Sequence, residues 1–107
     1  MDRCWLCGRN GQAERLEFHH VYPGPLRGLS TKYHAGVYLC GETCHRTGRF
    51  AVHRCKQTRE RLQDWMQRKL MKENNWSEED FRKIFGKSYL KEEFDNAEPH
   101  RADRQID

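Results

Sequence analysis

The stretch LCGETCH, residues 39–45, decides the fold together with CWLCGR, residues 4–9. The first holds two cysteines with three residues between them, and the second holds two cysteines with two residues between them. Short cysteine pairs of this kind, each in a turn, are typical of a tetrahedral zinc site in which thiolates fill all four positions. We therefore predict a structural zinc that stabilises the fold and leaves no open position for chemistry. Its ligands would be Cys4, Cys7, Cys40 and Cys44.

The composition explains why the chain would need such a site. Of its 107 residues, 34% are charged and 36% are hydrophobic, and the mean hydropathy is −1.13. A small domain with so little apolar surface usually depends on a metal or a disulfide. Charged residues follow Met1 directly and no apolar run has the length of a membrane span, so we expect a reducing cytoplasm, where clustered cysteines bind metals. Cys55 belongs to neither cysteine pair and is predicted to be a free thiol.

Charge is distributed unevenly along the chain, whose formal net charge is +4. Residues 1–56 carry nine Lys and Arg against four Asp and Glu, whereas residues 91–107 carry three against six. A basic excess on the half that is rich in cysteine and histidine favours a polyanionic partner such as nucleic acid. The alternative is that these basic residues are ordinary solvated surface.

The pattern of apolar residues predicts an α+β chain. Apolar, β-prone runs predict strands over residues 15–21 and 36–39. Residues 22–36, between them, are rich in Gly and Pro and are predicted to form an irregular loop. Apolar residues at three- and four-residue spacing then predict a helix over residues 54–75. Its apolar face would consist of Leu62, Trp65, Met66 and Leu70.

A second, shorter helix is predicted near the end of the chain. The sequence SEED, which starts at Ser77, is a capping box, and Gly86 is well placed to end the helix. Residues 91–107 are acidic and polar and are predicted to form a disordered tail. We therefore predict one domain over residues 1–90, with a metal-binding core over 1–53 and a helical extension over 54–90.

Histidines gather in the same half of the chain as the cysteines. His19 and His20 are adjacent at the end of the first predicted strand. His45 directly follows a predicted zinc ligand, and His53 lies where the long helix is expected to begin. If the two strands pair, these imidazoles converge, which suits a divalent metal with open positions and a further histidine as general base. The alternative is that the histidines support the fold or are merely exposed.

With these motifs the chain resembles the HNH nucleases of the ββα-metal (His-Me finger) group, most closely the small HNH proteins of bacteriophages and prophages. In those proteins HHV, VYLC, CHR and AVH occur in the same order, followed by a helix and an ending like WSEEDFRKIFGKSYL, here residues 76–90. The resemblance covers about residues 4–90. It implies a small zinc-stabilised ββα-metal (treble-clef-like) finger followed by two C-terminal helices, in the cytoplasm of a bacterial host cell.

The resemblance also implies a role for four of the six histidines. His20 would be the general base that activates water against the scissile phosphate. His19, His45 and His53 would bind a catalytic Mg²⁺, Mn²⁺, Ni²⁺ or Zn²⁺, which polarises the phosphate and stabilises the leaving 3′ oxygen. The middle Asn of the family's motif has no counterpart in this chain, so His34 or a backbone group would take its place.

The predicted function is a metal-dependent endonuclease that nicks or cuts double-stranded DNA. Four basic residues flank the proposed site and are predicted to contact phosphates regardless of base sequence: Arg27, Lys32, Arg46 and Arg49. Two alternatives stay open, a zinc-stabilised nucleic-acid-binding module without catalysis and a phage packaging or regulatory partner that docks through its helical half. The adjacent histidines favour the enzyme, and the missing Asn favours the binding module.

Overall fold

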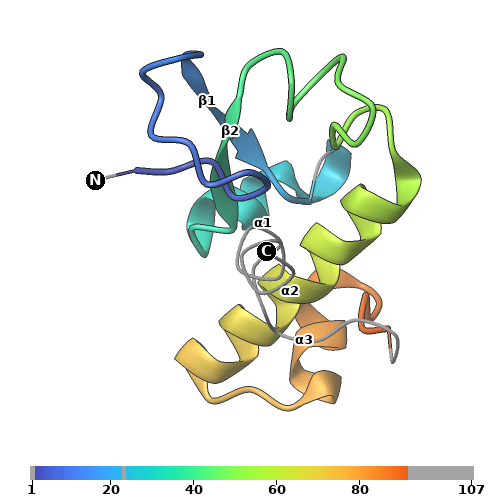
Figure 1. Ribbon diagram of the computed structural model, residues 1–107. Helices are drawn as coiled ribbons and strands as arrows, with labels where there is room; N and C mark the ends of the chain where they lie inside the picture. The colour runs from blue at the N-terminus through green and yellow to red at the C-terminus, as the bar shows by residue number, and fades with distance from the viewer. Residues whose placement is uncertain (1, 23, 92–107) are drawn as a thin grey trace, which may run out of the picture. The chain divides into compact units, whose positions relative to one another are not determined.

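Over residues 2–22 and 24–91, which the computed structural model describes, the chain is α+β with two short strands and three α-helices (Figure 1). The elements in chain order are β1 (Leu16–His20), the 3-10 turn η1 (Gly24–Leu26), α1 (Arg27–Lys32), β2 (Gly36–Cys40), α2 (Lys56–Asn74) and α3 (Glu78–Phe85). The described residues form two compact units, the first of residues 2–19 and 37–59 and the second of residues 20–36 and 60–91. The predicted tail lies outside the described residues from residue 92 onward.

Strands β1 and β2 pair as a two-stranded antiparallel sheet. Backbone hydrogen bonds join Gly41 N to Arg15 O at 2.9 Å and Val21 N to Ala35 O at 3.0 Å, so opposite ends of the two strands meet. Both strands lie within a residue or two of the predicted ranges. Neighbouring side chains on a strand point to opposite faces, and His19 is accordingly buried next to the exposed Phe18.

The loop predicted over residues 22–36 is wrong, because this segment contains η1 and the helix α1. The short helix is held by Ser30, whose buried hydroxyl accepts from Tyr22 N at 3.2 Å and donates to Tyr22 O at 2.9 Å. This tertiary contact outweighs the unfavourable helix propensity of Gly28. Gly and Pro content predicts a loop from neighbouring residues alone. The contact that stabilises α1 instead joins Ser30 to Tyr22, eight residues away.

The long helix predicted over residues 54–75 is confirmed as α2, and Leu62, Met66 and Leu70 on its predicted apolar face are buried. The fourth predicted core residue, Trp65, is only partly buried. No helix among the described residues combines the length and the apolar character that crossing a bilayer would require.

Helix α3 begins and ends where its capping signals predict. The Ser77 side chain accepts from Asp80 N at 3.1 Å, the Asp80 carboxylate accepts from Ser77 N at 2.9 Å, and Gly86 ends the helix with a φ of 93°. A side chain at Gly86 would be strained in this left-handed conformation. The helix buries Phe81 and Phe85, and the ring of Tyr22 lies 5.0 Å from that of Phe85 in the core of the second unit.

The first unit has a smaller apolar core than the second. Its buried side chains include Trp5, Leu39 and Val52, and the Trp5 backbone extends the sheet region by donating to Tyr38 O at 2.9 Å. Most of the remaining chain in this unit consists of turns between residues 41 and 55. A metal at a cysteine cluster is a common way to stabilise a unit with so small an apolar core.

Candidate metal centres

The four predicted zinc ligands come together in the first unit. The ligand atoms of Cys4, Cys7, Cys40 and Cys44 all lie within 4.8 Å of one another. Tight turns present each pair: Gly8 N donates to Cys4 O at 2.9 Å, and Cys44 N donates to Cys40 O at 3.3 Å. The cluster could therefore hold a structural metal such as zinc.

The geometry and acidity of the thiols fit a tetrahedral thiolate site. Ligands about 2.3 Å from a tetrahedral zinc lie about 3.8 Å apart, and the Cys7 and Cys40 sulfurs are 3.6 Å apart. A hydrogen bond from Cys44 lowers the pKa of Cys4 to about 4, and the same bond raises the pKa of Cys44. Burial raises the pKa of Cys40 to about 12. Four sulfurs this close cannot all ionise without a cation to neutralise them, which is the condition that a bound zinc satisfies.

The fifth cysteine, Cys55, lies outside this cluster and is a free thiol, as predicted. It is partly buried and precedes α2 directly. Hydrogen bonds from Thr58 lower the pKa of Cys55, as expected for a sulfur at the start of a helix. Its contacts are thus those of a helix cap and not of a metal ligand.

Glu14 braces the second cysteine turn, a role that the sequence did not reveal. One carboxylate oxygen accepts from Glu42 N at 2.6 Å and Thr43 N at 2.7 Å, and the other accepts from the Thr43 hydroxyl at 2.6 Å. These three bonds lower the pKa of Glu14, so the carboxylate stays ionised. The brace holds the residue immediately before the ligand Cys44.

Of the four histidines with a predicted role in catalysis or metal binding, three converge in the first unit. Ligand nitrogens of His19, His45 and His53 lie within 4.8 Å of one another, and the Nε2 atoms of His45 and His53 are 3.0 Å apart. Two ligand nitrogens on one tetrahedral metal would be separated by about 3.3 Å. His53 N donates to His45 O at 3.1 Å, so the chain turns back between them and overcomes their eight-residue separation.

Partial burial and nearby positive charges favour the neutral form of His53. His19 is 8% exposed, whereas His53 is open to solvent, so the cluster has an accessible side. Burial of its ring, with smaller effects from His45 and Arg46, lowers the pKa of His53. A neutral imidazole is the form that binds a metal, and a metal held by three imidazoles would have positions left for further ligands.

Glu17 orients His45, a role that none of the sequence motifs indicated. Its carboxylate accepts from His45 Nδ1 at 3.0 Å and from Arg46 at 2.7 Å, and the bond from His45 lowers the pKa of Glu17. Because Nδ1 carries the proton, Nε2 presents its lone pair toward His53. The available signal was spacing: Glu17 precedes His19 by two residues on one strand, which places both on the same face.

His20, the predicted general base, belongs to the second unit. Its Nε2 lies 3.3 Å from the hydroxyl oxygen of Thr31, which itself donates to Arg27 O at 3.2 Å. With the Thr31 proton on Arg27 O, the hydroxyl would accept from His20 Nε2–H, which would leave the lone pair on Nδ1. His34, expected to replace the missing Asn, is exposed in the same unit with a φ of 57°.

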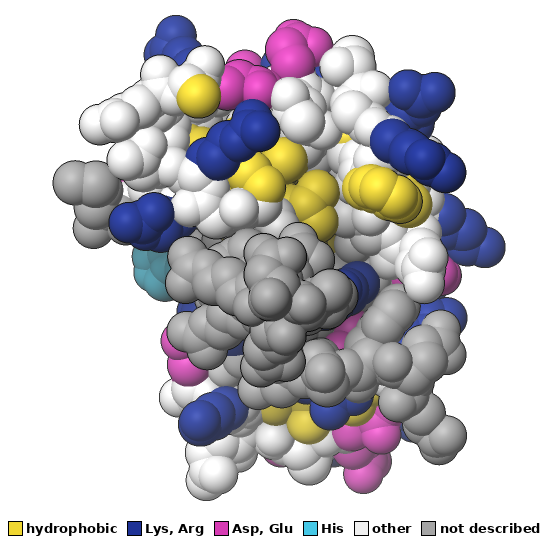
Figure 2. All heavy atoms as spheres, in the orientation of Figure 1, with side chains coloured by type: hydrophobic (Ala, Val, Ile, Leu, Met, Phe, Trp, Pro, Cys, Tyr) yellow, Lys and Arg dark blue, Asp and Glu magenta, His cyan; other side chains and the backbone are white. Residues whose placement is uncertain are grey.

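The four predicted phosphate contacts are all exposed. Arg27 and Lys32 belong to the second unit, and Arg46 and Arg49 to the first. Arg46 is held by the Glu17 carboxylate, which offsets part of its charge, whereas the Arg49 guanidinium lies 5.5 Å from the Phe50 ring. On the face shown in Figure 2, Lys and Arg side chains are interspersed with exposed hydrophobic ones.

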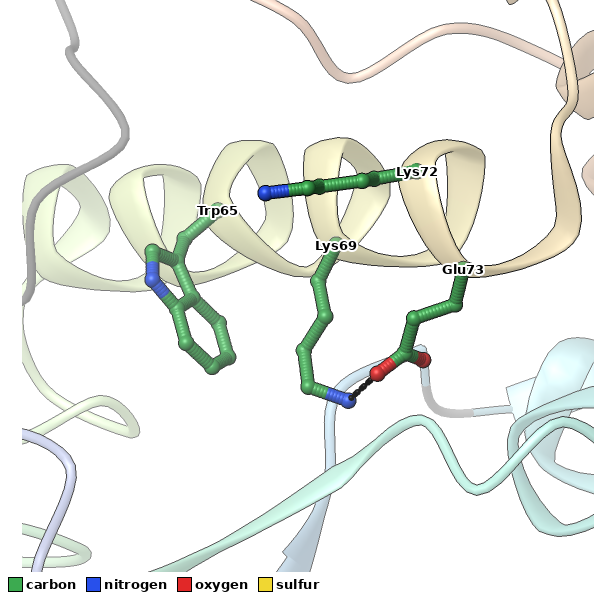
Figure 3. Close-up of a pocket in the computed structure, with 4 residues that line it drawn as sticks. All are labelled: Trp65, Lys69, Lys72 and Glu73. Atoms are coloured by element: carbon green, nitrogen blue, oxygen red, sulfur yellow. Dashed lines mark hydrogen bonds and ion pairs between the residues drawn. The ribbon is translucent and has the colours of Figure 1, made fainter.

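A shallow pocket runs along one side of α2 in the second unit, lined by Trp65, Lys69, Lys72 and Glu73 (Figure 3). Lys69 Nζ lies 2.8 Å from the Glu73 carboxylate, so the charge of one of the two lysines in the pocket is neutralised. No histidine or cysteine lines it, and its one carboxylate, Glu73, is the group that pairs with Lys69.

The two clusters thus differ in chemistry. Four cysteine sulfurs make a closed site suited to a structural metal, and three imidazoles make a site with room for further ligands. Comparison with known proteins finds no matching family model, no similar curated protein and no similar solved structure.

Proposed function

We propose that this chain is a metal-dependent endonuclease of the HNH type that hydrolyses phosphodiester bonds of DNA, encoded by a phage or prophage. The observation that carries the proposal is the convergence of His19, His45 and His53 within 4.8 Å. A protein that only needed a stable fold would gain little from three imidazoles beside a separate cysteine cluster. The sequence resemblance supports the same conclusion.

The chain's own residues would divide the chemistry as follows. His19, His45 and His53 would hold the divalent metal, with Glu17 fixing the tautomer of His45. When bound, the metal supplies Lewis-acid stabilisation of negative charge on the phosphate and the leaving oxygen. His20, the immediate chain neighbour of His19, would accept a proton from the attacking water at Nδ1 while its Nε2–H remains on the Thr31 hydroxyl.

The rest of the first unit would serve as the scaffold of this site. In this proposal the cysteine cluster, β1, β2 and the start of α2 form a zinc-stabilised ββα-metal finger of the treble-clef type. The zinc would have a structural role only, because its four thiolates leave no open position. Phosphate contacts by the exposed Arg27, Lys32, Arg46 and Arg49 would add affinity without base specificity.

Plasmid cleavage tests the proposal. Supercoiled plasmid is incubated with wild type in Mg²⁺, Mn²⁺ or Ni²⁺, and then with EDTA. We expect cleavage that EDTA abolishes, and a loss of at least about a hundredfold in rate for His20→Ala. His20→Ala should still bind the divalent metal by calorimetry, whereas His45→Ala should lose both metal binding and cleavage. An intact plasmid with every metal, or equal cleavage by His20→Ala, would refute the catalytic assignment.

One observation favours a second candidate, a zinc-stabilised nucleic-acid-binding or phage packaging module without catalysis. The chain has no Asn between His20 and Cys40, where the family's motif carries one. The contact from Thr31 could orient His20 in its place, but Thr31 is exposed and its oxygen lies 3.3 Å from the ring. DNA binding without cleavage in the plasmid assay would support this second candidate.

A further inference from the structure

The turn that joins His45 to His53 is rigid in spite of having no helix or strand. Val52 N donates to Cys44 O at 2.9 Å, and His53 N donates to His45 O at 3.1 Å. Inside the turn, Gly48 approaches the Thr43 carbonyl so closely that a Cβ at this position would lie 1.9 Å from the oxygen. The backbone of this turn is therefore held in a defined conformation.

Phe50 projects from this turn. It is 59% exposed, the largest exposed fraction of any large hydrophobic side chain among the described residues. The two following residues, Ala51 and Val52, are fully buried and anchor the backbone beneath it. The Arg49 guanidinium lies 5.5 Å from the centre of the Phe50 ring, so a cation covers part of the aromatic surface.

The sequence around Phe50 is rich in basic residues. Residues 43–59 contain five Lys and Arg and no Asp or Glu. An apolar protein partner would favour a wider apolar patch, whereas an isolated ring among cations fits a polyanion with flat aromatic groups.

We propose that Phe50 stacks on a base of the bound DNA, while Arg49 and its basic neighbours contact the phosphates on either side. This inference rests on the proposed function, because it places DNA against the histidine cluster. Because Phe50 belongs to the turn that joins His45 to His53 in the chain, we expect its ring to meet bases near the bond that is cut. Stacking of this kind requires an unstacked base, so the DNA would be kinked, nicked or locally single-stranded there.

The test measures binding in the His20→Ala background, which separates it from cleavage. Oligonucleotide duplexes carry 2-aminopurine at successive positions, and affinity is measured by fluorescence anisotropy. We expect Phe50→Ala to weaken binding by about tenfold and to abolish the change in 2-aminopurine emission at one position. Phe50→Tyr should retain both signals, because it keeps the aromatic face.

Phe18→Ala is the matched control. Phe18 is also exposed, at 48%, but its ring packs edge-on against Tyr38 at 5.3 Å on the sheet, and we expect its loss to leave DNA affinity within twofold. If wild type cleaves DNA but Phe50→Ala binds as well as its parent, this inference fails and the proposed function stands. Equal losses for Phe18→Ala and Phe50→Ala would also overturn it. If no DNA binding is detected for wild type or its His20→Ala parent, both proposals fail.

Discussion

Replacement of Glu17 by Gln should weaken metal binding at the histidine cluster while leaving the cysteine site intact. The Glu17 carboxylate accepts from His45 Nδ1 at 3.0 Å, and this bond keeps the lone pair on Nε2, the atom 3.0 Å from His53 Nε2. A Gln side chain of the same shape loses the charge. It can also present its NH₂ group to Nδ1, which would move the ring proton to Nε2, where a metal would have to bind.

The expected loss of metal affinity follows from the hydrogen bond by which the Glu17 carboxylate orients His45. Outer contacts that orient a metal-bound imidazole typically change metal affinity by about 10- to 100-fold. Glu17 is partly exposed and also engages Arg46 at 2.7 Å, so we expect the lower end of this range, about tenfold. Glu17→Ala, which removes both hydrogen bonds, should cost at least as much.

Calorimetric titration with Ni²⁺ or Co²⁺ measures this loss directly in protein that already carries one equivalent of zinc. Glu42→Gln is the matched control, because Glu42 also faces Arg46, at 3.7 Å, but makes no contact with His45. We expect its metal affinity to stay within twofold of wild type. Wild-type affinity in both Glu17 variants would refute the claim that Glu17 sets the tautomer of His45.

Three further predictions concern the zinc site, its brace and the proposed base. Cys40→Ser should reduce tightly bound zinc below about half an equivalent and unfold the first unit, whereas Cys55→Ser should retain one equivalent, as measured by metal analysis and circular dichroism. Glu14→Gln should lower the melting temperature by a few degrees at pH 7. The folded-state pKa of Glu14 lies below its ordinary value of 4.5, so its stabilisation exists above that pH and is lost as the pH falls below it. The melting curves of wild type and variant should therefore converge under acid conditions, and a constant difference would contradict the brace. Thr31→Val should slow plasmid cleavage by about tenfold and Thr31→Ser should restore it. The ¹⁵N shifts of the His20 ring should report loss of the Nε2–H tautomer in the Val variant alone, and unchanged shifts would argue against the contact.

Local sequence patterns predicted both strands, the helices α2 and α3, and the residues of the cysteine and histidine clusters, but not η1 or α1. Cysteine spacing identified the four sulfurs that converge, and the capping box at Ser77 located the start of α3. The residues that support each site were not predictable in this way. Glu14 meets Thr43 across 29 positions of the chain, and Ser30 stabilises α1 through the backbone of Tyr22. Such partners depend on register and on turns, which single-sequence periodicity does not specify.

The geometry of the histidine cluster depends on the turn that carries the cysteine Cys44. His45 is the residue after Cys44, and the backbone bonds from Val52 to Cys44 and from His53 to His45 attach the third histidine to the same turn. A metal at the cysteines would therefore preorganise two of the three imidazoles before any second ion arrives. We do not expect the converse, because Glu14 and the turns' own backbone supply hydrogen bonds that close the cysteine turns. Loss of the structural metal should then abolish binding at the histidines, whereas chelation of a weaker ion from the histidines should leave the cysteine site and its fold in place.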